Sequence, residues 1–295
     1  MSKYGPVDLK KAVDYASLKD RNVVVTGGSS GFGKAFVHMF VDNGANVVLA
    51  DVQDGPGQEL EKELASKGAK VKFVHVDVTS FESQVNLVRQ SLEFFPRNEI
   101  DIFVPCAGIL NYPTQINPQD PAALADLKTP PEDLTGRVIS VNLAGVWIGT
   151  MLVARYGMGL HKAAESSGKT SAPTKTIVLI ASLAGYCGAE GSVEYTTSKF
   201  GVRGLLRGLR KHLAAVGVRI NAVSPFYVDT PMTSFAVPVL KENGIPISTV
   251  EHVVEATARL ATDEEAYGKT QSSSDARMFA NTLRSFDIRH AGRAI

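Results

Sequence analysis

Three side chains near the middle of the chain have the types and spacing needed to move a proton on and off an oxygen. Tyr195 and Lys199 stand four residues apart, and Ser182 closes an apolar run a short way upstream. Residues 194–215 have helical periodicity, so Tyr195 and Lys199 project from one face. A free tyrosine titrates near pH ~10, and a neighbouring ammonium lowers that value by favouring the phenolate. Such a tyrosine can accept a proton from an alcohol or return one to a carbonyl, with the Ser182 hydroxyl holding the substrate oxygen.

Taken alone, a tyrosine and a lysine at this spacing are more typical of an ordinary exposed helical pair. A glycine-rich segment far upstream favours the chemical interpretation. It reads Thr-Gly-Gly-Ser-Ser-Gly-Phe-Gly at residues 26–33 and lies between an apolar strand at 23–26 and a helical segment at 35–40. A tight strand-to-helix turn must therefore form at the glycines.

The glycines of this turn are suited to hold a dinucleotide. Gly27 can take positive φ without steric cost. Gly31 and Gly33 lack Cβ atoms, which lets a pyrophosphate approach the backbone and the helix pack on the sheet. The helix N-terminus offers unpaired N–H groups to the phosphates. A turn that merely packs explains this segment alone equally well. The predicted cofactor contacts are Gly27, Ser29, Ser30, Gly31, Phe32 and Gly33.

Two carboxylates follow the next apolar strands. Asp51 ends the strand at 46–50, about 20 residues past the glycines, where it can accept hydrogen bonds from ribose hydroxyls. Asp77 ends the strand after that, and ligands of open α/β sheets bind at this edge. A carboxylate at position 51 repels a 2′-phosphate, and neither Val52 nor Ser30 supplies a positive charge. The sequence therefore predicts NAD rather than NADP as the cofactor.

These segments together resemble the short-chain dehydrogenase/reductase family from about residue 19 to about residue 261. The family's Thr-Gly-x-x-x-Gly-x-Gly matches residues 26–33, and its acidic selector of NAD matches Asp51. Its Tyr-x-x-x-Lys pair matches Tyr195 and Lys199, with the family's serine at Ser182. The remaining matches are Asp77 and Val78 for the adenine contact and Asn142 for the catalytic asparagine.

By this resemblance, Tyr195 is the general acid/base, Lys199 lowers its pKa and holds the nicotinamide ribose, and Ser182 orients the substrate oxygen. Asn142 supports a water in the proton relay. Hydride passes directly between the substrate carbon and nicotinamide C4, so the cofactor supplies the redox chemistry. The implied catalytic set is Asn142, Ser182, Tyr195 and Lys199. The further implied cofactor contacts are Val52, Asp77, Val78, Ala107, Gly108, Pro225, Val228 and Thr230.

The chain departs from the family pattern in three places. Asn-Asn-Ala-Gly after the fourth strand is Pro-Cys-Ala-Gly at residues 105–108, which loses the hydrogen bonds of the leading asparagine. Pro-Gly after the sixth strand is Pro225-Phe226, and Phe226 adds bulk near the nicotinamide. The family's last strand and its Asp-Gly-Gly ending have no match in the polar run at 268–275. The expected sheet therefore has six or seven strands.

Residues 227–247 correspond to the family's substrate lid, and several of them are apolar. An apolar lid indicates an apolar substrate, such as a terpenoid, steroid-like, polyketide or fatty alcohol. Packing of a helix onto the core explains the same residues equally well. By the family mapping, Cys187 lies in the loop after Ser182. The predicted substrate pocket comprises Cys187, Phe226, Met232 and Phe235.

Length and composition fit a single α/β domain. The chain has 295 residues, of which 44% are hydrophobic and 21% charged, and apolar strands alternate with helical patterns. We expect one Rossmann-like, doubly wound parallel sheet of six or seven strands flanked by helices over residues 19–275. Residues 1–18 are expected to form an N-terminal arm, and residues 276–295 a C-terminal tail that caps a partner subunit.

Charge and composition also bear on partners. The formal net charge of +1 gives no general attraction to nucleic acid. We find no apolar run of membrane-spanning length and no signal-peptide core. Two cysteines and six scattered histidines indicate neither a disulfide framework nor a metal site. We expect a cytoplasmic homodimer or homotetramer with no nucleic acid, membrane or metal among its partners.

The sequence thus predicts an NAD-dependent oxidoreductase that interconverts an apolar secondary alcohol and a ketone. Three alternatives remain open: an NADP-dependent biosynthetic ketone reductase, a dinucleotide-binding scaffold without catalysis, and an enzyme that uses the same site for a reaction other than simple redox. The presence of all four implied catalytic residues argues against the scaffold.

Overall fold

The structure is a computed structural model that describes residues 7–110, 135–159, 175–189 and 191–272. The predicted C-terminal tail at 276–295 lies outside the described residues. Of the predicted N-terminal arm, residues 7–18 are described, and they pack against the domain. A 3₁₀-helix, η1 (Tyr15–Leu18), buries Leu18 in the core. The Lys11 ammonium lies 2.6 Å from a carboxylate oxygen of Asp263.

Within the described residues, seven parallel strands form one sheet in the order β3-β2-β1-β4-β5-β6-β7. The order reverses between β1 and β4, which opens a crevice at the carboxyl ends of these strands. This topology confirms the predicted Rossmann-like, doubly wound fold. The strands are β1 (Asn22–Thr26), β2 (Asn46–Asp51), β3 (Val71–His75), β4 (Ile102–Pro105), β5 (Lys175–Ile180), β6 (Val218–Ser224) and β7 (Thr270–Ser272).

The seventh strand forms within the polar run at 268–275, where the residue pattern did not predict a strand. β7 has three residues, pairs in parallel with residues 222–224 of β6, and is only half-buried. An edge strand this short needs no apolar run, because only one side of its backbone pairs and its side chains reach solvent. The sheet therefore has the larger of the two predicted strand counts.

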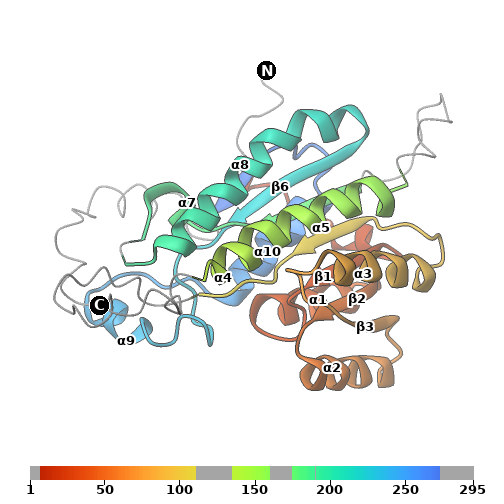
Figure 1. The fold of residues 1–295 in the computed structure, drawn as a ribbon, viewed down its shortest axis with the longest axis horizontal. Helices are drawn as coiled ribbons and strands as arrows, with labels where there is room; N and C mark the ends of the chain where they lie inside the picture. Colours follow the sequence, from red (N-terminus) through yellow and green to blue (C-terminus); the bar gives the residue numbers. More distant parts are fainter. Residues whose placement is uncertain (1–6, 111–134, 160–174, 190, 273–295) are drawn as a thin grey trace.

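Helices cover both faces of the sheet. One face packs against α1 (Gly31–Asp42), α2 (Asp54–Ser66) and α10 (Val250–Thr262). The other packs against α3 (Phe81–Phe94), α5 (Val146–Leu152) and α8 (Val193–Ala215), and Figure 1 shows α5 and α8 running along each other. The shorter elements are α4 (Arg137–Ile139), the π-helices η4 (Ser140–Gly145) and η5 (Val153–Gly157), α7 (Ala184–Cys187) and α9 (Val237–Glu242).

The central strands are buried on both faces, as their β-branched, apolar sequences predict. In β1, Val23 and Val25 point into the core beneath α1 and α10, whereas Val24 points into the core beneath α3, α5 and α8. All three are fully buried. This burial fixes the register of β1 and so the position of the turn that follows it.

The continuous helix at residues 137–157 is long and apolar enough to cross a membrane by length and composition, with a mean hydropathy of 1.5. This differs from the expectation that no apolar run has that length. Half of its apolar window is buried inside the fold. A core helix that packs on a sheet and on neighbouring helices passes the same test.

Candidate active site

The glycine-rich turn connects β1 to α1 and needs glycine for two separate reasons. Gly27 has a φ of +67°, and a Cβ there would lie 2.7 Å from the Cα of Ala107. A Cβ at Gly33 would lie 1.9 Å from the carbonyl oxygen of Gly27. Side chains at these positions would therefore push α1 away from the sheet and the turn away from the strand end.

The turn also leaves polar groups for a ligand. Ser30 precedes α1 in an extended conformation, and its side chain makes no capping hydrogen bond. Within the described part of the chain, the buried Oγ of Ser29 has no hydrogen-bond partner. A Cβ at Gly31 would meet nothing within 4 Å, so the space in front of the turn is open. The first N–H groups of α1 can therefore take a phosphate, and these residues fit a dinucleotide pyrophosphate.

Asp51 is buried at the carboxyl end of β2, directly beside this turn. Its Oδ2 accepts a hydrogen bond from the backbone N–H of Ser29 at 3.0 Å, and its Oδ1 accepts one from Gln53 at 3.1 Å. Each carboxylate oxygen can accept a further bond. The carboxylate is thus fixed in place with capacity for the hydroxyls of a ribose. Val52, the next residue, is exposed.

The two residues predicted to contact adenine differ in their surroundings. Asp77 is exposed, and its Oδ1 accepts hydrogen bonds from the hydroxyl of Thr79 at 2.7 Å and from its N–H at 2.9 Å. These two bonds lower the pKa of Asp77, the hydroxyl contributing most. Val78 is buried, and its carbonyl oxygen accepts a hydrogen bond from Nε2 of Gln84 at 2.5 Å.

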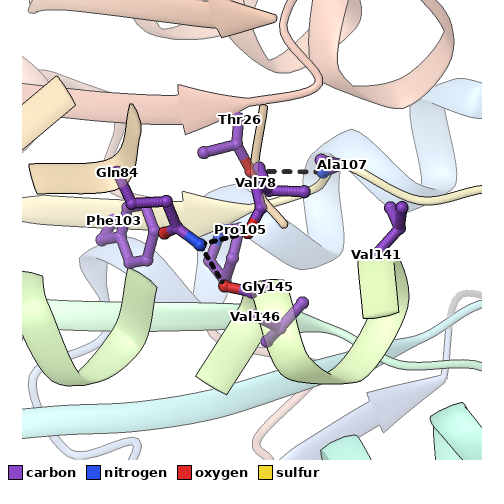
Figure 2. Close-up of a pocket in the computed structure, with 9 residues that line it drawn as sticks. All are labelled: Thr26, Val78, Gln84, Phe103, Pro105, Ala107, Val141, Gly145 and Val146. Atoms are coloured by element: carbon purple, nitrogen blue, oxygen red, sulfur yellow. Dashed lines mark hydrogen bonds between the residues drawn. The ribbon is translucent and has the colours of Figure 1, made fainter. Parts of the chain in front are cut away.

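Gln84 is a supporting residue that the sequence reasoning missed. It is buried on α3, and its Nε2 also donates to the carbonyl oxygen of Gly145 at 3.0 Å (Figure 2). One side chain therefore ties the loop after β3 to the π-helix η4. The sequence offers one signal for this role: a glutamine stands on the apolar face of an amphipathic helix, and a buried amide needs hydrogen-bond partners.

Gln84 also lines a narrow gap between the ends of β1 and β4 and the helix η4, which Figure 2 shows. Thr26 closes one side, and its Oγ1 accepts a hydrogen bond from the N–H of Ala107 at 3.2 Å. This gap is too narrow to hold a water molecule. The residues around the gap are thus close-packed, and this packing fixes the ends of β1 and β4 relative to each other. Its lining residues are Thr26, Val78, Gln84, Phe103, Pro105, Ala107, Val141, Gly145 and Val146.

Asn142 lies fully buried in η4, and its side chain is committed to the backbone. Its Nδ2 donates to the carbonyl oxygen of Ile109 at 2.8 Å, and its Oδ1 accepts from the N–H of Ile109 at 2.8 Å. The amide therefore anchors the segment Ala107–Gly108–Ile109 that follows β4. The water that Asn142 is expected to support stays a prediction, and its side-chain hydrogen bonds to Ile109 were not foreseen.

Lys199 and Tyr195 come together on α8 as predicted. The Nζ of Lys199 lies 5.4 Å from the centroid of the Tyr195 ring and donates a hydrogen bond to the carbonyl oxygen of Ile180 at 3.0 Å. Burial lowers the pKa of Lys199 from 10.5 to about 8, and interaction with Cys106 acts in the opposite direction. The ammonium thus lies at Ile180, the last residue of β5 and two residues before Ser182, and it has further N–H donors for a ligand.

Ser182 is half-buried in the loop after β5. Its Oγ accepts a hydrogen bond from the N–H of Ala184 at 3.2 Å, which leaves its own hydroxyl proton for another acceptor. The next residue, Leu183, donates its N–H to the carbonyl oxygen of Pro225 at 2.9 Å. Phe226 follows, half-buried, with its ring edge-on to Tyr227 at 4.9 Å between centroids. The bulky residue that replaces the family's glycine therefore lies close to the serine loop.

The two cysteines are free thiols. Burial raises the pKa of Cys106 to about 12, so the thiol at the end of β4 stays protonated at neutral pH. Cys187 is exposed at the end of α7, and its Sγ donates to the carbonyl oxygen of Leu183 at 3.3 Å. Burial of part of the side chain raises its pKa. Neither environment favours a thiolate nucleophile.

The lid segment at 227–247 is partly structured around Thr233. Val228 is buried and pairs with Ser248, and its carbonyl oxygen accepts a hydrogen bond from the hydroxyl of Thr233. Thr230 lies 3.0 Å from the same hydroxyl. Met232 and Phe235 are 40% and 48% exposed. Their place in a substrate pocket stays a prediction, as do those of Cys187 and Phe226.

The arrangement assembles two functions at one edge of the sheet. The turn after β1 and the carboxylate after β2 can bind an adenosine diphosphate group. The elements after β4 and β5 and the helix α8 bring an ammonium, a phenol and a hydroxyl to the neighbouring strand ends. These groups can exchange a proton with an alcohol or carbonyl oxygen.

Comparison with known proteins agrees with this arrangement. The family model for short chain dehydrogenases matches residues 21–238. A 5′-hydroxyaverantin dehydrogenase of Dothistroma septosporum is 35% identical over 273 residues, which cover 88% of this chain and 86% of that protein. A mitochondrial borneol dehydrogenase of Lavandula x intermedia is 33% identical over 255 residues, which cover 85% and 86%.

A solved structure from Beutenbergia cavernae, which holds NADP at low occupancy, superposes with a TM-score of 0.70. It is 28% identical, and the match covers 90% of this chain and 99% of that one. The family match spans most of the chain, and the strand order, glycine turn and Tyr195–Lys199 pair agree with it. The chain therefore belongs to the short-chain dehydrogenase/reductase family of oxidoreductases.

Proposed function

We propose that this protein interconverts a secondary alcohol and a ketone with NAD as cofactor and Tyr195 as general acid/base. The observation that carries the proposal is the buried ammonium of Lys199, 5.4 Å from the centroid of the Tyr195 ring. An ammonium in a site of low dielectric stabilises the phenolate of a neighbouring tyrosine. The tyrosine can then act near neutral pH.

In the oxidative direction, the phenolate of Tyr195 takes the proton of the substrate hydroxyl, and the Ser182 hydroxyl donates a hydrogen bond to the substrate oxygen and keeps its proton. Lys199 keeps one hydrogen bond to Ile180 and has two further N–H donors for a ribose hydroxyl. The bound nicotinamide supplies the hydride acceptor in this direction and the hydride donor in the reverse. Reduction returns the proton from Tyr195 to the carbonyl oxygen.

The substrate we propose is an apolar small molecule. Two kinds of relative carry the names hydroxyaverantin dehydrogenase and borneol dehydrogenase. In this chain, Phe226 and Tyr227 place two aromatic rings after β6, close to the serine loop. Phe235 and Met232 on the lid add exposed apolar surface. A pocket bounded by such residues favours apolar ligands over sugars.

We propose NAD over NADP because the carboxylate of Asp51 is held at the end of β2, where a 2′-phosphate would meet its negative charge. We expect fluorescence titrations to show at least about tenfold tighter binding of NADH than of NADPH, or about 1.4 kcal/mol. Asp51→Asn should narrow that preference, since it removes the charge and keeps the size. Asp54→Asn is the matched control, because Asp54 is an exposed carboxylate three residues further on.

The titration separates the candidate functions. Tighter binding of NADPH would contradict the role of Asp51 and favour the NADP-dependent ketone reductase. Binding of neither nucleotide would contradict the dehydrogenase function, and binding without turnover of any alcohol or ketone would favour the dinucleotide-binding scaffold without catalysis. An equal effect of Asp51→Asn and Asp54→Asn on the preference would show that general charge, and not the carboxylate at the end of β2, selects the cofactor.

We also propose that the protein works as a cytoplasmic homo-oligomer. Two large apolar side chains stand on the neighbouring helices α5 and α8. Trp147 on α5 is 54% exposed, and Phe200 on α8 is 44% exposed. Large exposed aromatic side chains are typical of the centre of protein interfaces. A second copy of the chain can cover the face that these two helices form.

A further inference from the structure

The short helix α7 determines where the hydroxyl of Ser182 lies. The N–H of Ala184, the first residue of α7, donates to the Oγ of Ser182 at 3.2 Å. The N–H of Gly185 donates to the carbonyl oxygen of Ser182 at 3.0 Å. A shift of α7 would therefore move the Ser182 hydroxyl with it. A helix of four residues has too few internal hydrogen bonds to hold its own place.

Arg203 binds α7 to the neighbouring helix α8. It lies on α8, one turn beyond Lys199. Its Nη1 donates a hydrogen bond to the carbonyl oxygen of Gly185 at 3.1 Å, and its Cζ lies 4.0 Å from the centroid of the Tyr186 ring. The flat guanidinium thus covers one face of the aromatic ring and binds the adjacent carbonyl at the same time.

The two helices touch directly next to this contact. A Cβ at Gly185 would lie 2.7 Å from the carbonyl oxygen of Lys199, so the backbone of α7 rests on the backbone of α8 at the catalytic lysine. Beyond α7, the hydroxyl of Thr196 accepts a hydrogen bond from the N–H of Ala189 at 3.0 Å. Arg203 is the only charged side chain among these contacts, and it binds the middle of α7.

We propose that Arg203 is a positioning residue: it clamps α7 to α8 and thereby fixes the Ser182 hydroxyl relative to Tyr195 and Lys199. The inference rests on the proposed function for its catalytic consequence. The clamp itself is a structural contact and can be measured without turnover. Small displacements of groups that orient a substrate lower the rate steeply, because the reacting atoms leave their productive geometry.

The alkylation rate of the native Cys187 thiol can show whether α7 stays bound to α8. Cys187 is exposed at the end of α7, and its thiol is bonded to the carbonyl oxygen of Leu183 within the same turn. We expect Arg203→Ala to raise the alkylation rate of Cys187 by iodoacetamide at least about threefold, because opening of α7 releases the thiol. Loss of a positive charge would not by itself speed alkylation, since it does not favour the thiolate. Buried Cys106 serves as the internal reference in the same mass spectrum.

Turnover provides the second readout. Arg203→Ala should lower kcat/KM for an alcohol roughly 10- to 100-fold while the Kd for NADH changes less than about twofold. Arg203→Lys keeps a cation near the ring but loses the planar fork, so it should recover part of the loss. Arg207→Ala, an exposed arginine one turn further along α8, is the matched control.

The outcomes decide between separate claims. Faster alkylation of Cys187 together with reduced kcat/KM supports the proposal. Unchanged alkylation in Arg203→Ala contradicts the clamp, and faster alkylation with unchanged kcat/KM contradicts its positioning role. If Arg203→Ala does not fold, Arg203→Lys carries the same comparison. A wild-type protein that binds NADH but oxidises no alcohol would refute the proposed function, and alkylation would still decide whether the clamp exists.

Discussion

Lys199 is the residue on which the electrostatics of the site depend. Its ammonium is buried, and burial lowers its pKa to about 8. At neutral pH it is still mostly charged, and in the mechanism that we propose this positive charge favours the phenolate of Tyr195. The same burial makes the charged form costly to the fold. A residue that helps the chemistry therefore destabilises the protein in the cofactor-free state.

This cost predicts how stability depends on pH. Between pH 8 and 10.5 the unfolded chain holds a proton on Lys199 that the folded chain has released, so the stability of the wild type rises with pH across that window. The change corresponds to about 3 kcal/mol at ~1.4 kcal/mol per pH unit. We expect the stability of Lys199→Met, relative to wild type, to fall by roughly this amount from pH 7.5 to 10.5 in urea unfolding experiments.

The matched control is Lys211→Met, which removes an exposed ammonium from the same helix. Its stability relative to wild type should stay nearly flat over the same pH range. A flat difference for Lys199→Met as well would show that Lys199 is not held in a desolvated environment. The electrostatic argument for Tyr195 would then lose its basis.

Several residues of the candidate site could be predicted from the sequence because their pattern is local. Tyr195 and Lys199 share a helix face by spacing alone, and Asp51 directly follows an apolar strand. The bonds of Asn142 to Ile109 could not be foreseen in this way. They join a helix to a loop 33 residues away, and Ile109 takes part only through its backbone, which carries no signal of residue type.

At the scale of elements, apolar periodicity predicted the bounds of β1, β2 and the helix α8 to within one residue, and the predicted helix at 35–40 covers only part of α1. The predicted helix at 194–215 is α8 at 193–215, and the predicted strand at 46–50 is β2 at 46–51. Elements that tertiary contacts stabilise were not predicted. β7 is polar and half-buried, and the π-helix η4 reads as ordinary helix in sequence. Their stability comes from neighbours rather than from their own pattern.

Gln84 provides a test at this scale, because its side chain joins the loop after β3 to the π-helix η4. Gln84→Leu keeps the approximate size but removes the donor to the buried carbonyls of Val78 and Gly145. We expect a loss of about 1–3 kcal/mol in the free energy of unfolding, because these acceptors lose that donor. Urea unfolding measures it, with exposed Arg89→Ala on the same helix as control.

A loss below about 0.5 kcal/mol, the size typical of surface substitutions, would contradict this role of Gln84. The two carbonyls would then be satisfied in another way. Weaker binding of NADH should accompany the loss of stability, since Val78 is one of the predicted adenine contacts. The titration used for the cofactor preference measures that second effect.

At the scale of the whole molecule, the helices α5 and α8 run along each other (Figure 1), and each carries an exposed aromatic residue, Trp147 on α5 and Phe200 on α8. We expect Trp147→Glu together with Phe200→Glu to lower the oligomeric state, because two carboxylates would have to be buried in the interface. Light scattering after size exclusion measures the mass. A wild type that is already a 31.5 kDa monomer, or a double variant of unchanged mass, would contradict the proposed interface.

We propose that this site oxidises an apolar secondary alcohol with Tyr195 as the base. The most direct measurement is NADH formation by wild type and Tyr195→Phe over a panel of apolar secondary alcohols, borneol included, with NADH binding measured for both. We expect turnover of at least one alcohol by wild type and a loss of roughly 10²–10⁴-fold in Tyr195→Phe with binding retained. Equal turnover in both, or none in a wild type that binds NADH, would contradict the account.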